Sequence, residues 1–139
     1  MNFESAKLSD AVFENATLTN VNFRTTIMKR ANFRHTCLED VKFPSVNGKD
    51  IDFHSAEIKN GNFIASILVN ANFSKIKSEK MDFRSANLAN ADFHNSSLAN
   101  SIFENANGYN TNFRHTILNN SNFDRAKFLR ANFSVSQKL

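Results

Sequence analysis

The histidines and arginines of this chain stand in a pattern that could do chemistry. His35 and His115 belong to two identical pentads, Asn-Phe-Arg-His-Thr, at residues 32–36 and 112–116. An imidazole beside a guanidinium can bind an oxyanion, and the imidazole changes charge near neutral pH. Two histidines can also begin a metal site, and a cysteine such as Cys37 can act as a nucleophile when a histidine activates it. Which of these chemistries is available depends on the elements that position the side chains.

A period of five residues runs through the chain and indicates which residues are neighbours. Phenylalanine occupies every position ending in 3, over residues 3–133, and a mostly aliphatic residue lies midway between each pair. Gly48, Ser78 and Gly108 interrupt this second series. Over residues 6–131, the position two before each centre is small or β-branched, with one exception. We expect neighbouring side chains to repack locally where the series is interrupted.

The period of five fits neither a helix nor a simple strand. Residues five apart on an α-helix are about 140° apart, so the phenylalanines would be smeared around its surface. A strand alternates with period two. A short extended step followed by a corner does fit, because it turns two residues of each pentad inward. Right-angled corners would close a coil after four pentads, or 20 residues.

The pentads resemble those of the pentapeptide-repeat family, whose consensus is a small residue, Asp or Asn, Leu or Phe, and two polar residues. Ala-Asn-Phe-Arg-His and Ala-Asp-Phe-His-Asn are examples, and the match covers nearly the whole chain. The resemblance implies an all-β fold, a right-handed quadrilateral parallel β-helix. We expect about seven coils of 20 residues in a single solenoid domain, residues 1–139. The ten-residue alternation of Phe with aliphatic residues supports four sides independently, because it places each kind on two opposite faces.

Stacking of residues 20 apart predicts the core and the corners. One aromatic stack is predicted from Phe13, Phe33, Phe53, Phe73, Phe93 and Phe113. Hydrogen-bonded asparagine ladders are predicted along two corners, one with Asn60, Asn100 and Asn120, the other with Asn70, Asn90 and Asn110.

Residues 20 apart also form columns on the outer surface, and one edge collects all four histidines. It combines the columns that contain residues 34 and 35. We interpret it as a cationic, pH-sensitive surface for an acidic partner or for phosphates. The alternative is a solvated edge whose residues were duplicated with the repeats. The candidate interaction edge consists of Arg34, His35, His54, Lys75, His94, Arg114 and His115.

Two apolar surfaces are further candidates for contacts. Exposed apolar residues in a row suggest a contact patch, although incidental exposure is the alternative. The end of a solenoid leaves backbone groups unpaired, so we expect a homodimer through the C-terminal coil. The candidate patch is Ile67, Val69, Tyr109 and Leu129, and the candidate dimer end is Phe128, Phe133 and Val135.

Enzyme chemistry is not expected from this arrangement. Cys37 lies two residues from His35, but successive outward positions diverge at a corner, and a convex rod offers no cleft for nucleophilic catalysis. Histidine pairs such as His94 and His115 make a poor metal site without a nearby carboxylate. We therefore expect no catalytic residue, no metal and no cofactor. The sequence has no glycine-rich phosphate loop and no aromatic surface for stacking bases, which argues against specific nucleic-acid binding.

The compartment is predicted from what the chain lacks. No apolar run approaches the roughly 20 residues that a membrane span needs, and the N-terminal segment lacks the basic and apolar regions of a secretory signal. Cys37 is the only cysteine, so no intrachain disulfide can form. We expect no membrane span and a cytoplasmic location. Export as a secreted bacterial effector is the alternative.

The function expected is that of a non-enzymatic protein–protein interaction module, a rigid rod that presents surface columns to an unknown partner. The family resemblance implies a rival, because some pentapeptide-repeat proteins confer quinolone resistance by imitating DNA and binding DNA gyrase or topoisomerase. Such mimicry needs a strongly negative surface. This chain has a formal net charge of +4, and no inserted loop interrupts its register.

Overall fold

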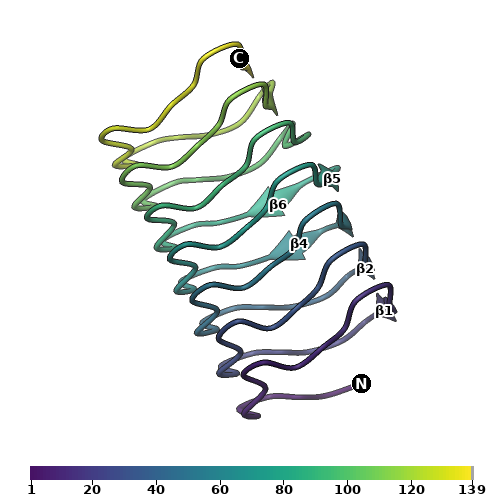
Figure 1. Ribbon diagram of the computed structural model, residues 1–139. Coiled ribbons are helices and arrows are strands. Elements are labelled where there is room, and N and C mark those ends of the chain that lie inside the picture. The colour runs from purple at the N-terminus through teal and green to yellow at the C-terminus, as the bar shows by residue number, and fades with distance from the viewer. Residues whose placement is uncertain (139) are drawn as a thin grey trace.

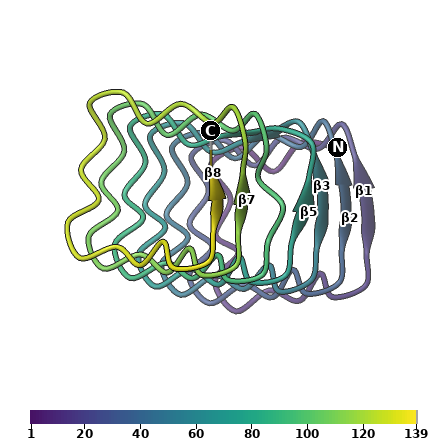
Figure 2. The same ribbon diagram turned by 90° about the horizontal axis from the view of Figure 1, so that it is seen from above.

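The computed structural model describes residues 1–138 as a right-handed quadrilateral β-helix, which confirms the predicted fold. Figure 1 shows the coils piled along one axis, with the N-terminus at one end and the C-terminus at the other. In the view from above (Figure 2), successive coils follow nearly the same four-sided outline. Within residues 1–138, no helix has the length and apolar character needed to cross a bilayer.

Short parallel strands join coils at a constant offset of 20 residues. Thr17 pairs with Cys37, and Cys37 pairs in turn with Glu57. Isolated parallel bridges, such as that between Asp92 and Asn112, keep the same offset on the other sides. Strands β1, β2, β3 and β5 form one sheet, β4 pairs with β6, and β7 pairs with β8. The strands are β1 (Thr17–Thr19), β2 (Cys37–Glu39), β3 (Glu57–Lys59), β4 (Gly61–Asn62), β5 (Lys77–Ser78), β6 (Met81–Asp82), β7 (Ile117–Leu118) and β8 (Gln137–Lys138).

The corners depend on a left-handed residue at the end of each pentad. Every fifth residue from Ser5 to Val135, except Lys80, has a positive φ between 53° and 62°, and none of them is glycine. The amide of Ala6 donates to the carbonyl of Phe3 at 2.9 Å and closes the first of these turns. Asparagine and aspartate tolerate this conformation better than other residues with a side chain, which explains why they are frequent at these positions.

The asparagine or aspartate that precedes a phenylalanine fixes the same turn from its other side. The side-chain Oδ1 of Asp52 accepts a hydrogen bond from the amide of His54 at 2.9 Å, and Asn112 does the same for the amide of Arg114 at 3.1 Å. This bond satisfies a backbone donor that the tight turn would otherwise leave free. It also holds the polar side chain on the outer face, next to the residue that follows the phenylalanine.

Phenyl rings fill the interior in two interlocking stacks. Phe73 stacks on Phe53 at 5.0 Å and on Phe93 at 4.9 Å, measured between ring centroids, and meets Phe63 of the other stack edge to face at 5.5 Å. Of the predicted core stack, all members but one are fully buried. The exception is Phe13, which begins its stack and is only partly buried because a ring, that of Phe33, stacks on it from one side alone.

One asparagine ladder forms and the other does not. Asn70 donates to Asp50 at 2.8 Å, Asn90 to Asn70 at 3.3 Å, and Asn110 to Asn90 at 2.9 Å, so this corner is bonded through four layers. On the second corner, Asn60 donates to Asp40 at 3.0 Å. In the described part of the chain, this series goes no further. Lys80 occupies the next layer, so the predicted ladder of Asn60, Asn100 and Asn120 is wrong.

Candidate functional site

The predicted edge residues lie on adjacent coils along one side of the rod. Backbone hydrogen bonds link them directly: the amide of His35 donates to the carbonyl of His54 at 3.0 Å, and that of Lys75 to the carbonyl of His94 at 2.9 Å. The residues that lie one and two positions after each phenylalanine are therefore neighbours between adjacent coils, as the period of 20 predicts. Whether a partner binds this edge stays a prediction.

An ion pair links two adjacent coils in the N-terminal half of the edge. Nη1 of Arg34 lies 3.2 Å from Oδ2 of Asp52, which belongs to the next coil. Both side chains are part-buried, because the neighbouring coils flank them. The guanidinium of Arg34 is therefore already engaged within the protein and has less capacity to bind a partner.

His54 sits beside this pair in an environment that keeps its ring neutral. Its Nδ1 lies 2.8 Å from Oγ of Ser74, and its ring meets that of His35 edge to face at 5.9 Å. Burial lowers the pKa of His54 below its ordinary value, and the positive charges of Arg34 and Lys75 lower it further. His54 therefore resists taking up a proton.

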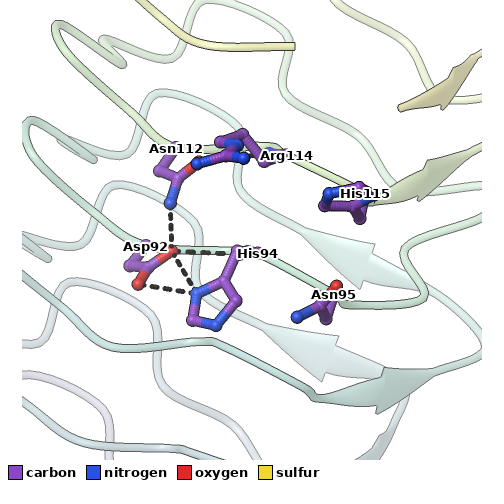
Figure 3. Close-up of a pocket in the computed structure, with 6 residues that line it drawn as sticks. All are labelled: Asp92, His94, Asn95, Asn112, Arg114 and His115. Carbon is purple, nitrogen blue, oxygen red and sulfur yellow. Dashed lines mark hydrogen bonds and ion pairs between the residues drawn. The ribbon is translucent and has the colours of Figure 1, made fainter. Parts of the chain in front are cut away.

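The C-terminal half of the edge contains a surface depression of about 350 Å³ between two adjacent coils. Figure 3 shows Asp92, His94 and Asn95 on one coil, and Asn112, Arg114 and His115 on the next. Oδ1 of Asp92 accepts a hydrogen bond from the amide of His94 at 3.0 Å and one from Nδ1 of the His94 ring at 2.9 Å. It also accepts one from Nδ2 of Asn112 on the next coil at 2.9 Å. This network fixes the His94 ring in one orientation.

The edge is of mixed charge, whereas a cationic surface was predicted. Two carboxylates that precede phenylalanines, Asp52 and Asp92, lie beside it, and sequence reasoning missed them. Their signal was present, because a residue one before a centre and a residue one after it share the same outer face. The formal charges on this side of the rod balance. Arg34, Lys75 and Arg114 are positive, and Glu14, which shares the column of Arg34, is negative together with Asp52 and Asp92.

The two identical pentads differ in their surroundings. Arg34 has Asp52 eighteen residues later, on the adjacent coil, and the two form an ion pair. The equivalent position for Arg114 is Asn132, whose Oδ1 accepts the amide of Ser134 at 3.0 Å. Among the described residues, the guanidinium of Arg114 has no ion-pair or hydrogen-bond partner. The same holds for the ammonium group of Lys75.

The candidate apolar patch is exposed only in part. The exposed fractions are 46% for Ile67, 39% for Tyr109 and 71% for Leu129, whereas Val69 is half-buried. The guanidinium carbon of Arg130 lies 5.9 Å from the centre of the Tyr109 ring, so a cation covers part of the patch. An interface at this patch stays a prediction.

The candidate dimer end contains both half-buried and exposed side chains. Phe128 and Phe133 are partly buried and pack against the core, and Val135 is 72% exposed. Cys37 is an exposed free thiol on β2. No group of three or more His, Cys, Asp or Glu side chains within residues 1–138 is arranged to hold a metal ion.

Comparison with known proteins gives matches over most of the chain. A family model described as a pentapeptide repeat region matches residues 1–73, and one described as pentapeptide repeats (8 copies) matches residues 80–107 and 109–134. No curated protein matches the sequence.

Several solved structures are similar to this chain. QnrB1, a plasmid-mediated fluoroquinolone resistance protein, is 20% identical with a TM-score of 0.44, covering 99% of this chain and 77% of that one. A pentapeptide repeat protein of the Arabidopsis thaliana thylakoid lumen is 23% identical with a TM-score of 0.45, covering 87% and 67%. HetL of Nostoc sp., a pentapeptide repeat protein involved in heterocyst differentiation regulation, is 15% identical with a TM-score of 0.31, covering 99% and 86%.

Proposed function

The chain belongs to the pentapeptide-repeat family, and from this premise we propose that it is a non-enzymatic interaction module whose candidate edge binds a protein partner. The observation that carries the proposal is the pair of cations on this edge, Lys75 and Arg114, that have no partner within the described residues. Charged side chains held on a rigid scaffold without an internal partner can meet opposite charges on another protein.

The scaffold favours such a use because its backbone is held in place before binding. Each coil is hydrogen-bonded to the next through the backbone, for example from Asn95 to Arg114 at 3.0 Å. A partner would therefore order few additional residues when it binds, which lowers the entropic cost of association. Since the free charges on the edge are positive, we propose a partner with an acidic surface.

The charges do not favour the DNA-mimicking alternative. Imitation of duplex DNA requires a continuous negative surface. On this edge, Asp52 and Asp92 are both engaged by neighbouring basic or amide groups, and the whole chain has a formal net charge of +4. A DNA gyrase supercoiling assay tests this alternative, and inhibition at low micromolar protein would favour it over the present proposal.

The proposal is tested by affinity co-purification with three versions of the protein. The edge variant Lys75→Glu/Arg114→Glu reverses both free cations, and the control Arg125→Glu/Lys127→Glu makes the same charge change at exposed residues outside the edge. We expect proteins that the wild type and the control retain to be lost from the edge variant. Equal recovery by all three would contradict binding at this edge.

A further inference from the structure

The geometry points to an oxyanion-binding subsite in the depression between the coils of His94 and Arg114, which takes a phosphoryl or carboxylate group carried by a partner protein. This inference rests on the proposed function and deepens it, because it names the chemical group that the edge recognises. The depression holds about 350 Å³ and is open to solvent, so such a group on a flexible side chain can enter it.

Arg114 supplies the charge and the geometry that the subsite needs. Its guanidinium has no partner within residues 1–138, whereas that of Arg34 in the identical pentad is paired with Asp52. A free guanidinium offers two parallel N–H groups, which match two oxygens of a carboxylate or a phosphate. The loss of one carboxylate, through Asn132 at the position equivalent to Asp52, is what leaves Arg114 available.

Asp92 lies in the same depression but does not neutralise Arg114 by direct contact. Its Oδ1 accepts from the amide and Nδ1 of His94 and from Nδ2 of Asn112, and its Oδ2 also lies 2.9 Å from Nδ1 of His94. Oδ1 of this carboxylate therefore has three donors, whereas Oδ2 has one, Nδ1 of His94, among the described residues. A carboxylate only accepts hydrogen bonds, so Nδ1 of His94 must carry a proton.

His94, His115 and Asn95 line the rest of the depression. Nδ1 of His94 is held by Asp92, which fixes the orientation of this ring beside the depression. His115 is exposed and stands on the same coil as Arg114, while Asn95 adds a side-chain amide from the coil of His94 (Figure 3). The coils lie about 4.8 Å apart, so one oxyanion can bridge groups on both.

The equivalent place in the N-terminal half of the edge lacks these features. Arg34 is engaged by Asp52, and Nδ1 of His54 is bonded to Ser74, a neutral hydroxyl. The two copies of the pentad thus form a matched pair, one with a free guanidinium and one with an engaged guanidinium. Arg34 provides the internal control for Arg114.

The subsite is tested by NMR titration of the isotope-labelled protein with inorganic phosphate. We expect saturable shifts of the side-chain signals of Arg114, His94 and His115 in the wild type and in Arg34→Gln. In Arg114→Gln, binding should be about tenfold weaker, as expected for the loss of a charge-assisted hydrogen bond. Asn132→Asp should weaken binding to a similar extent by giving Arg114 an internal partner. The carboxylate introduced at position 132 can still accept the hydrogen bond from the amide of Ser134, as Asp52 does from the amide of His54.

Three peptides of otherwise identical sequence, with phosphoserine, glutamate or serine at one position, identify the source of the oxyanion. The phosphoserine or the glutamate peptide should bind at the same signals, and the serine peptide should not. Equal affinity of all three peptides, equal weakening by Arg34→Gln and Arg114→Gln, or shifts that do not saturate would each overturn the subsite. The phosphate titration needs no partner protein, so its result is independent of the co-purification. If phosphate binding saturates but the edge variant recovers its partners as the wild type does, the proposed function is contradicted and the subsite is not.

Discussion

Phe128 occupies the space that Gly108 leaves in the core. A Cβ atom placed on Gly108 would overlap the Cε1 and Cδ1 atoms of the Phe128 ring in the next coil. The ring therefore leans into a gap that would otherwise be an empty layer in the aliphatic stack, where most coils have Leu, Ile or Met. The repacking predicted from the interrupted series is confirmed at this pair.

Substitution of Gly108 by alanine should therefore destabilise the protein. Forcing the Phe128 ring out of its place is overpacking, which costs about 1–3 kcal/mol of unfolding free energy. Gly48→Ala is the matched control, because its Cβ would lie 3.2 Å from Cδ2 of Leu68, a flexible side chain that can move slightly. Chemical denaturation of both variants measures the difference. The double variant Gly108→Ala/Phe128→Leu should recover stability, and strict additivity of the two changes would contradict this interpretation.

The middle of the aromatic stack should be the most sensitive part of the core. Phe73 is fully buried between Phe53 and Phe93, so Phe73→Ala should lower the unfolding free energy by about 3–5 kcal/mol through the cavity that it leaves. Phe3→Ala should cost less, because Phe3 is only partly buried. Urea unfolding compares the two variants, and a similar loss for both would show that stability is not graded along the rod.

The left-handed corners allow a stabilising substitution. Ala65 has a φ of 56° and is exposed, and a non-glycine residue in this region is strained unless it is asparagine or aspartate. A residue with a Cβ atom costs roughly 1–2 kcal/mol in this conformation, and asparagine avoids part of that cost, so Ala65→Asn should raise the unfolding free energy by about 1 kcal/mol. Lys80→Asn is the control, because Lys80 is the position in the five-residue series without a positive φ. A gain at Lys80 equal to that at Ala65 would argue against the backbone as the cause.

Acid should weaken the fold through His54. Its pKa is lowered from the usual 6.5 by burial, by Arg34 and by Lys75, although Asp52 opposes the change and His35 adds a further small lowering effect. As the pH falls below the usual histidine pKa of 6.5, the unfolded chain binds a proton at His54 more readily than the folded chain does. The unfolding free energy therefore falls as the pH decreases. Denaturation at about pH 7.5 and about pH 5.5 measures the slope. His54→Gln should flatten it and Arg34→Gln should reduce it in part; an unchanged slope in His54→Gln would exclude this histidine as the cause.

The C-terminal coil should bind a second copy of the chain. Phe128 and Phe133 are half-buried there, and Val135 is 72% exposed. We expect sedimentation velocity at high micromolar concentration to show a dimer, and Val135→Asp to shift it toward monomer. Val12→Asp is the matched control, because Val12 in the first coil is also 72% exposed. A monomeric wild type at that concentration would contradict the predicted homodimer.

Much of the fold could be predicted because each pentad repeats the same local geometry. The phenylalanine at every tenth position and the small residue two before each centre are local signals, and stacking carries them through the whole chain. The predicted ladder through Asn60 is wrong, and Phe13 joins its stack but is less buried than the other members, because both depend on what lies in the adjacent coil. A periodic pattern identifies which positions face inward but gives no information on how two particular side chains meet.

By itself, the sequence determined the period, the inward positions, the four-sided coil and the gathering of the histidines on one edge, because all of these follow from repeating one short unit. Only the tertiary structure decided which charges on that edge are free. Arg34 and Arg114 stand in identical pentads, yet Arg34 is paired with Asp52, whereas the equivalent position for Arg114 is the neutral Asn132. The physical reason is that an ion pair depends on distance and orientation between coils, which the side chains of both layers set together.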